Sequence, residues 1–177
     1  MSRKAKGKAR NVKLMIFDVD GILTDGRLFF GADGEAVKAF NVLDGHGIRM
    51  LQAQDIPVAL ISARNSPAVM RRSLDLGILH TRLGEQDKLS AFQSLLEKMG
   101  LRAPDCGYMG DDVLDLPVLI RAGFSASVPA AHEEVRTRVD YVTAAGGGQG
   151  AVREVCDLIL KAQGRYDAAM KTYLING

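Results

Sequence analysis

Short uninterrupted apolar runs recur along the chain, and each stops at a polar residue or a glycine. The first run, Leu14–Phe17, stops at Asp18, and the second, Pro57–Ile61, stops at Ser62. Runs of this length are typical of parallel strands that are buried on both faces. We therefore expect strands at these two positions and at three later ones: Cys106–Met109, Phe124–Val128 and Tyr141–Val142.

Between these runs, apolar residues recur at helical spacing. The stretch 86–99 ends at Gly100, as a helix C-terminus does, and its apolar positions are Leu89, Phe92, Leu95, Leu96 and Met99. A final amphipathic helix is predicted from Val152, Val155, Cys156, Ile159 and Leu160. Strands that alternate with helices indicate an α/β fold with a mainly parallel sheet covered by helices on both faces.

The segment 26–40 (GRLFFGADGEAVKAF) interrupts this alternation. Two short strand-like pieces flank Gly31-Ala32-Asp33-Gly34, which predicts a β-hairpin directly after the first strand. The apolar cluster Leu28-Phe29-Phe30 on this hairpin needs a partner, because an isolated two-stranded hairpin is only marginally stable. Packing on the chain's own body and packing against another subunit are both compatible with the sequence.

Charge is distributed unevenly along the 177 residues. The net charge is +2, but residues 1–10 hold five basic groups and no acids, which leaves 18 basic against 21 acidic groups elsewhere. We expect a disordered basic tail over 1–10, one globular domain over 11–165 and a C-terminal tail over 166–177. Nucleic-acid binding is not expected, because no basic face or aromatic interleaving accompanies the basic tail.

The cellular location is predicted from two features that the sequence lacks: a membrane span and a cysteine motif. No apolar run approaches the roughly 18 residues that a membrane span requires. Cys106 and Cys156 do not have the spacing of metal ligands or of a redox pair. We expect a cytoplasmic protein with reduced cysteines and no membrane partner.

The first strand leads directly into two carboxylates, Asp18 and Asp20, which Gly21 follows. Residues two apart in an extended segment point the same way, so this pair can share one face as the strand ends. Carboxylates crowded there need a cation or a shared proton, and open α/β sheets bind ligands at the carboxyl ends of their strands. A strand end with turn-forming aspartates is the alternative interpretation.

Three later positions carry groups that phosphoryl transfer from Asp18 would need. Ser62 offers a hydroxyl at the end of the second run, although an ordinary helix N-cap would explain it equally well. Lys88 begins a predicted helix, where the helix dipole disfavours a cation by about 0.3–1 kcal/mol, so an acidic neighbour or a phosphate must compensate it. The acidic cluster after the third run offers the oxygen ligands that Mg²⁺ prefers: Asp111, Asp112 and Asp115.

Taken in chain order, Asp-Val-Asp-Gly-Ile-Leu-Thr (18–24), Ser62, Lys88 and Gly-Asp-Asp-Val-Leu-Asp-Leu (110–116) resemble the four motifs of the haloacid dehalogenase superfamily. The resemblance implies a Rossmann-like three-layer α/β/α fold and a magnesium-dependent phosphatase. It implies that Asp18 is the nucleophile forming an aspartyl-phosphate, that Asp20 is the acid/base, and that Ser62 and Lys88 hold the phosphoryl oxygens. The implied metal ligands are the Asp18 side chain, the Asp20 carbonyl oxygen and Asp111, with Asp112 and Asp115 supporting them and Asp115 as the partner of Lys88.

Superfamily members usually insert a cap domain, for which this chain has no room between its motifs. A closer resemblance, carried by DVDGILTDG (18–26), NVLDGHGI (41–48), GDDVLDL (110–116) and GQGAVREV (148–155), is to the phosphatases of 3-deoxy-D-manno-octulosonate (Kdo) 8-phosphate. Those enzymes of lipopolysaccharide biosynthesis are capless tetramers in which hairpins assemble together and neighbouring subunits complete each site. The resemblance therefore implies a sugar-acid phosphate substrate and a homotetramer.

Arg64 favours the eight-carbon substrate, because a guanidinium suits bidentate recognition of a sugar-acid carboxylate, although most arginines are simply exposed. Phosphatases of nine-carbon nonulosonate (sialic-acid-type) 9-phosphates resemble the family but tend toward glutamate there, and they remain the alternative. A catalytically silent binding or regulatory fold is the alternative of another class. The chain departs from the family at Ser62-Ala63 (commonly Thr-Gly) and at Gln149 (commonly Arg), which leaves open whether the loop around Gln149 contacts a ligand.

Overall fold

A six-stranded sheet, in which every neighbouring pair runs parallel, organises the computed structural model, which describes residues 3–174. The strand order is β5-β4-β1-β6-β7-β8. The strands are β1 (Leu14–Phe17), β4 (Val58–Ser62), β5 (His80–Leu83), β6 (Cys106–Met109), β7 (Phe124–Ser127) and β8 (Tyr141–Val142). β1 lies between β4 and β6, and all residues of these three strands are buried, as expected for the centre of a parallel sheet.

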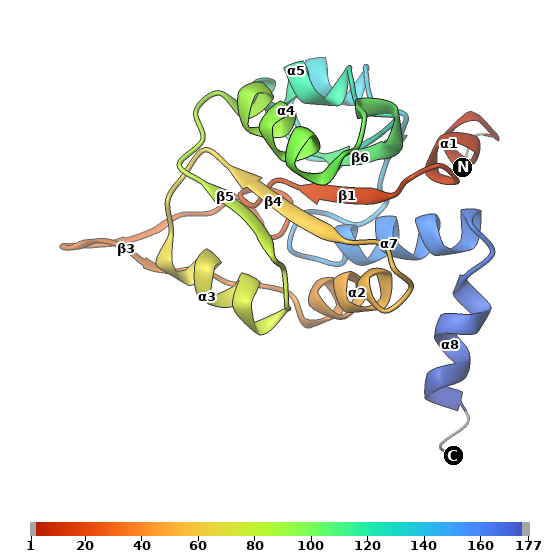
Figure 1. The fold of residues 1–177 in the computed structure, drawn as a ribbon. Coiled ribbons are helices and arrows are strands. Elements are labelled where there is room, and N and C mark those ends of the chain that lie inside the picture. The colour runs from red at the N-terminus through yellow and green to blue at the C-terminus, as the bar shows by residue number, and fades with distance from the viewer. Residues whose placement is uncertain (1–2, 175–177) are drawn as a thin grey trace.

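Helices cover both faces of the sheet, as Figure 1 shows. One layer holds α4 (Lys88–Met99) and α5 (Leu116–Leu119), and the other holds α2 (Val42–Gln52), α3 (Pro67–Asp75) and α7 (Ala151–Ala162). Two 3₁₀ turns, η1 (Ala103–Asp105) and η2 (Val113–Asp115), and the short α6 (Glu133–Arg136) complete the connections. The predicted three-layer α/β/α fold is thereby confirmed.

The helix predicted over 86–99 begins at Lys88, because the Asp87 carboxylate caps it by accepting from the Ser90 N–H at 3.0 Å. Gly100 ends the helix in a left-handed conformation (φ +64°), as its position predicted. The apolar runs did not reveal β5, whose residues His80–Leu83 are half-buried at the sheet edge. A strand with neighbours on one side only does not need a continuous apolar run.

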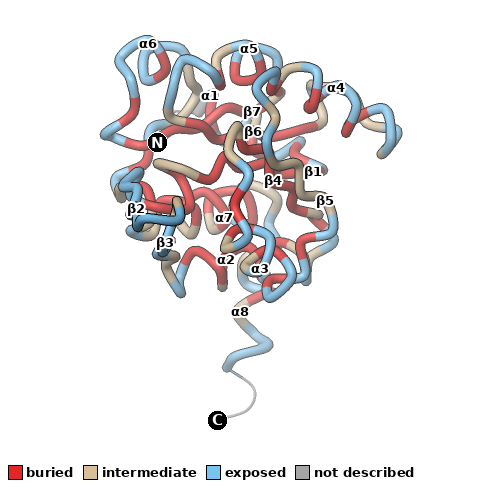
Figure 2. The backbone as a smooth tube through the Cα atoms, turned by 90° about the vertical axis from the view of Figure 1, so that its left-hand side faces the viewer, coloured by how far each residue is buried: buried red, intermediate tan, exposed pale blue. Residues whose placement is uncertain are grey.

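The predicted hairpin is present as β2 (Phe29–Gly31) and β3 (Gly34–Val37), paired antiparallel. Its apolar residues stay at the surface: Phe29 is 48% exposed, Phe30 63% and Val37 62%. Figure 2 shows the hairpin as an exposed projection beside the buried strands. Of the two packing alternatives, a single chain therefore does not bury this face on its own body. Among residues 3–174, the hairpin and α2 alone separate β1 from β4, so no cap domain is inserted there.

The expectation of a disordered basic tail is wrong for residues 3–9, which form helix α1 (Arg3–Ala9). Ala5 and Ala9, four residues apart, lie on one helix face and are 1% and 0% exposed, and α1 packs against α7. The Lys8 ammonium also pairs with Asp140 at 2.7 Å. Counting charges concealed the small apolar face that anchors this segment.

Helix α8 (Tyr166–Leu174) occupies most of the predicted C-terminal tail and points away from the body (Figure 1). Ala169 is its one buried residue, and the Lys161 ammonium lies 4.4 Å from the ring centre of Tyr166 at its start. Residues 1–2 and 175–177 of the two predicted tails lie outside the described residues. None of the helices within residues 3–174 has the length and apolarity that crossing a bilayer requires.

Candidate active site

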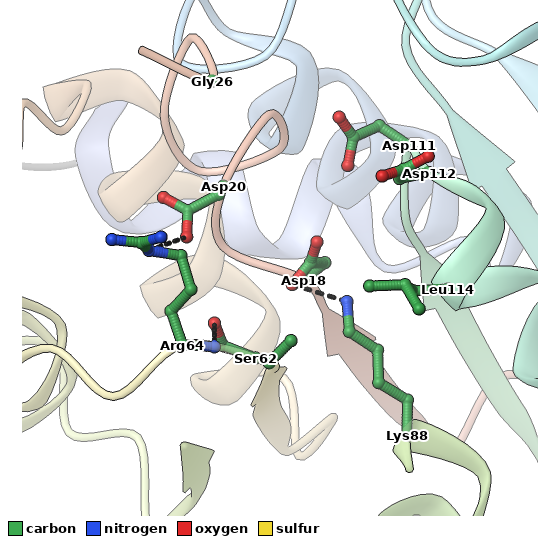
Figure 3. Close-up of a pocket in the computed structure, with 10 residues that line it drawn as sticks. Asp18, Asp20, Gly26, Ser62, Arg64, Lys88, Asp111, Asp112 and Leu114 are labelled. Atoms are coloured by element: carbon green, nitrogen blue, oxygen red, sulfur yellow. Dashed lines mark hydrogen bonds and ion pairs between the residues drawn. The ribbon is translucent and has the colours of Figure 1, made fainter. Parts of the chain in front are cut away.

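The carboxyl ends of β1, β4 and β6 meet at one edge of the sheet, where the strand order reverses direction around β1. The loops that follow these strands form a cavity of about 280 Å³, shown in Figure 3. Seven of the eight predicted site residues line it: Asp18, Asp20, Ser62, Arg64, Lys88, Asp111 and Asp112. Gly26, Ala63 and Leu114 complete the lining. The eighth, Asp115, lies fully buried behind Lys88.

Lys88 and two carboxylates form the centre of the site. The Lys88 ammonium lies 2.9 Å from Asp18 Oδ1 and 2.7 Å from Asp115 Oδ1, and all three residues are buried. Burial opposes the charged lysine, but the two carboxylates outweigh it and raise the pKa of Lys88. The predicted partner of Lys88 is therefore in place, and it offsets the unfavourable helix-start position of this cation.

The Asp115 carboxylate is fully occupied by hydrogen bonds. Its Oδ1 accepts from Lys88 and, at 2.7 Å, from the Tyr108 hydroxyl, and its Oδ2 accepts from the backbone N–H groups of Asp111 and Asp112 at 3.1 and 3.2 Å. One carboxylate oxygen each of Asp18, Asp111 and Asp115 lie within 4.8 Å of one another. Because the acceptor positions of Asp115 are all occupied, Asp18 and Asp111 are the members of this trio that can still ligate a cation.

This donor set fits Mg²⁺, which prefers hard oxygen ligands. Asp18 and Asp111 would supply side-chain oxygens, and the Asp20 carbonyl follows two residues after Asp18 on the same loop. The approach of Asp111 depends on Gly21 (φ +83°), where a Cβ would stand 1.9 Å from Asp111 Oδ2. Asp112 is different, since its exposed carboxylate caps η2 by accepting from the Val113 N–H at 2.7 Å. The geometry gives Asp112 a structural contact and leaves a role in supporting the metal ligands as a prediction.

Two carboxylates of the site, Asp18 and Asp111, have raised pKa values. Burial and the charge of Asp115 raise the pKa of Asp18 to about 8, although Lys88 opposes the shift. Burial and Asp115 likewise raise the pKa of Asp111 to about 7. Two neighbouring carboxylates that both resist ionisation create a place where a divalent cation is favoured.

The glycine-rich segment 146–148 packs against the loop that carries the two aspartates. The Gly148 N–H donates to the Ile22 carbonyl at 2.9 Å, and a Cβ on Gly147 would stand 1.8 Å from the Gly21 carbonyl oxygen. These close approaches explain the glycines without a bound anion. The contact of Gln149 with a ligand stays a prediction left open.

Asp20 lies on the opposite side of the cavity from Asp111 and Asp112, beside Arg64 (Figure 3). Its Oδ2 lies 3.8 Å from Arg64 Nε, and its Oδ1 contacts the ammonium of Lys38. The Ser62 hydroxyl is buried in the cavity wall and accepts from the Arg64 N–H at 3.3 Å. The structure thus brings together every site residue that the sequence predicted, whereas their chemical roles remain predictions.

Sequence reasoning missed three polar residues of the site: Lys38, Glu35 and Tyr108. Lys38 and Glu35 come from the hairpin, whose residues were interpreted only for their apolar cluster. Tyr108 sits within a strand that was interpreted as apolar, and its hydroxyl donates to Asp115 Oδ1 at 2.7 Å. Glu35 and Lys38 are oppositely charged residues three positions apart and close in sequence to the first motif. That pattern could have marked them as candidate site residues.

Comparisons with known proteins identify the family. The chain is 48% identical over 169 residues to the 3-deoxy-D-manno-octulosonate 8-phosphate phosphatase KdsC of Escherichia coli strain B, covering 96% of this chain and 90% of the relative. A structure of the phosphatase of that name from Moraxella catarrhalis, in complex with magnesium, phosphate and Kdo, matches with a TM-score of 0.95 and 44% identity over 98% of this chain and 99% of that one. The enzyme from Yersinia pestis matches with a TM-score of 0.92 and 43% identity over 94% and 90% of the two chains. No protein-family model matches the chain.

Fold and site together define a hydrolase of the haloacid dehalogenase class. Within that class, the chain belongs to the family of 3-deoxy-D-manno-octulosonate 8-phosphate phosphatases. The resemblance inferred from the motifs is thereby confirmed.

Mg²⁺ binding should become more stabilising as pH rises. In a chelator, the raised pKa values of Asp18 and Asp111 mean that these carboxylates favour the folded state below about pH 4 and lose that contribution as pH rises toward 8. A cation competes with the protons, so the Mg²⁺-induced rise in Tm should be larger at pH 8 than at pH 6.

Asp111→Asn should raise the Tm measured in chelator at pH 8 and remove most of the Mg²⁺-induced shift, whereas Asp112→Asn, at the adjacent exposed carboxylate, should keep that shift. Thermal unfolding at both pH values, with and without Mg²⁺, measures this. A Mg²⁺ effect that is equal at both pH values, or that Asp111→Asn preserves, would place the metal elsewhere.

Proposed function

We propose that this chain is a magnesium-dependent phosphatase that hydrolyses Kdo 8-phosphate to Kdo and inorganic phosphate, in lipopolysaccharide biosynthesis, through a phosphoryl group carried on Asp18. The observation that carries the proposal is the contact of the buried Lys88 ammonium with both Asp18 and Asp115 at the carboxyl edge of the sheet. It places a fixed cation beside a carboxylate that lines an open cavity. A nucleophilic carboxylate and a fixed positive charge are what transfer of a phosphoryl group requires.

In the first step, an Asp18 oxygen attacks phosphorus while the bond from phosphorus to the sugar oxygen breaks, and Asp20 gives that oxygen a proton. In the second step, Asp20 takes a proton from a water that attacks the aspartyl-phosphate, and phosphate leaves as the Asp18 carboxylate is restored. Lys88 and Ser62 hold phosphoryl oxygens. When bound by Asp18, Asp111 and the Asp20 carbonyl, Mg²⁺ neutralises phosphoryl charge.

Substrate choice rests on the family and on Arg64. The relative from Moraxella catarrhalis is described in complex with Kdo, and the matching curated relatives are named as Kdo 8-phosphate phosphatases. Arg64 lines the cavity with its side chain 40% exposed, so its guanidinium can meet the carboxylate of the sugar acid. A catalytically silent fold is disfavoured because Asp18, Asp20 and Lys88 are all present and converge on one cavity.

We further propose that the protein works as a cytoplasmic homotetramer in which the hairpins of four chains assemble. The support is the exposure of four apolar side chains gathered on the hairpin: Leu28 at 43%, Phe29 at 48%, Phe30 at 63% and Val37 at 62%. A cavity without a cap domain is open on one side, and a neighbouring subunit would close it and exclude water.

A substrate screen tests the activity directly. Phosphate release should be fastest with Kdo 8-phosphate, compared with nonulosonate 9-phosphates and common sugar phosphates, and EDTA should abolish it until Mg²⁺ is restored. Asp18→Asn should reduce release to background while the protein stays folded, because the amide keeps the shape but cannot act as the nucleophile. Near-normal release by this variant would contradict the covalent mechanism, and a preference for a nine-carbon ester would reassign the substrate.

The assembly is tested at Phe29 and Val37 and not at Phe30, because the Arg64 guanidinium lies 5.6 Å from the ring centre of Phe30. Phe29 and Val37 are cross-strand neighbours, and Phe29→Asp with Val37→Asp should split the tetramer, because unpaired charges in an apolar interface cost several kcal/mol each. Dissociation should lower kcat/KM for Kdo 8-phosphate more than for p-nitrophenyl phosphate, which needs less of the closed site. Leu79→Asp is the matched control, since Leu79 is 88% exposed outside the hairpin. Light scattering that shows an intact tetramer for the hairpin variant would contradict the proposed interface.

A further inference from the structure

Four charged side chains form a closed ring beside Asp18. The Lys38 ammonium contacts Asp20 Oδ1 and lies 3.2 Å from Glu35 Oε2. The Arg64 guanidinium completes the ring, with Nε 3.8 Å from Asp20 Oδ2 and Nη2 3.7 Å from Glu35 Oε2. Each cation therefore faces both anions, and the four charges sum to zero.

The ring joins three segments that are far apart in the sequence. Asp20 comes from the loop after β1, Arg64 from the loop after β4, and Glu35 and Lys38 from the hairpin. Glu35 also accepts from the hydroxyl of Ser66, the N-cap of α3, which fixes it to the β4 loop. Ion pairs thus hold the hairpin against the acid/base residue, and the exposed apolar residues of the hairpin take no part in these contacts.

Lys38 is the most buried member of the ring, with its side chain 1% exposed, compared with 40% for Arg64 and 22% for Asp20. A lysine at this depth is tolerated only where carboxylates face it, and removing one partner of such a pair is costly. The two steps proposed above give Lys38 no proton to carry and no phosphoryl oxygen to hold. Its buried charge is therefore unused by the chemistry as described so far.

We infer that Lys38 is a positioning residue for the acid/base Asp20, an inference that rests on the proposed phosphatase function. By occupying Oδ1, the Lys38 ammonium fixes the rotation of the carboxylate and leaves Oδ2 as the oxygen that exchanges protons. Asp20 lines the cavity with its side chain 22% exposed, and Arg64 Nε approaches Oδ2 only to 3.8 Å, which is longer than a hydrogen bond. The same oxygen then gives a proton to the sugar oxygen in the first step and receives one from water in the second.

Such positioning contributes strongly to the rate, because proton transfer requires the Asp20 carboxylate to lie at the right distance and angle from the reacting oxygen. General acid–base catalysis contributes about 10²–10⁴-fold, and a displacement of about 1 Å can cost about 10²-fold in rate. Binding of the phosphoryl group is different, since Lys88 and Ser62 lie outside the ring. Loss of Lys38 should therefore lower kcat and leave the affinity for phosphate intact.

The test compares Lys38→Met with the wild-type protein on Kdo 8-phosphate. We expect kcat to fall about 10²-fold, with the inhibition constant of inorganic phosphate within about threefold of wild type. Lys38→Arg, which keeps the positive charge on a larger planar group, should lose less kcat than Lys38→Met. Glu35→Gln, which keeps the Lys38–Asp20 contact, should lose much less. Lys8→Met removes a lysine ion pair far from the cavity and should keep wild-type kinetics.

Folding of the variants is controlled by a second substitution. Lys38→Met combined with Glu35→Gln removes cation and anion together, so no unpaired carboxylate remains at Glu35, and it should show the same loss of kcat as Lys38→Met. A kcat within about threefold of wild type in either variant overturns the inference, as does weakening of phosphate inhibition in proportion to the loss of kcat. Failure of the proposed function would show itself differently, as a wild-type protein, with Lys38 intact, that does not hydrolyse Kdo 8-phosphate.

Discussion

The buried carboxylate of Asp115 is the contact on which the rest of the site depends. A carboxylate removed from water must have its acceptors filled, and Asp115 obtains donors from α4, from β6 and from the backbone of the loop after β6. Satisfying this one group therefore fixes Lys88, which in turn faces Asp18, and orients the segment that carries Asp111. The proposed nucleophile, the fixed cation and a proposed metal ligand are positioned by this one carboxylate, whose hydrogen-bond acceptors are all occupied.

This arrangement also explains why glycines cluster in the surrounding loops. Asp111 reaches the cavity only because Gly21 lacks a side chain, and the loop of Gly21 is in turn packed by Gly147. A site that holds carboxylates this close together without a cation is electrostatically unfavourable, as the raised pKa values of Asp18 and Asp111 show. Packing of the fold holds these carboxylates in place, and binding of a divalent cation offsets their electrostatic repulsion.

The sequence was sufficient for the central features and insufficient for those that depend on contacts between loops. Apolar runs that end in polar residues predicted β1, β4 and β6 and placed Asp18, Ser62 and Asp111 at one edge, because parallel strands bring their carboxyl ends together. The ring of Lys38, Glu35, Asp20 and Arg64 was not predictable, since its members meet only after the hairpin folds back. Helix α1 was missed because its anchoring face consists of two alanines among basic residues.

The hairpin meets two demands at once, with Glu35 and Lys38 beside the proposed acid/base Asp20 and with exposed apolar residues at its surface. The proposed mechanism depends on Asp18 carrying the phosphoryl group, and mass spectrometry of protein quenched with acid during turnover of Kdo 8-phosphate tests that most directly. We predict one phosphoryl group on the peptide that contains Asp18, present in the wild-type protein and absent from Asp18→Asn. A phosphoryl group on another residue, or turnover with none on the protein at any time point, would contradict the account.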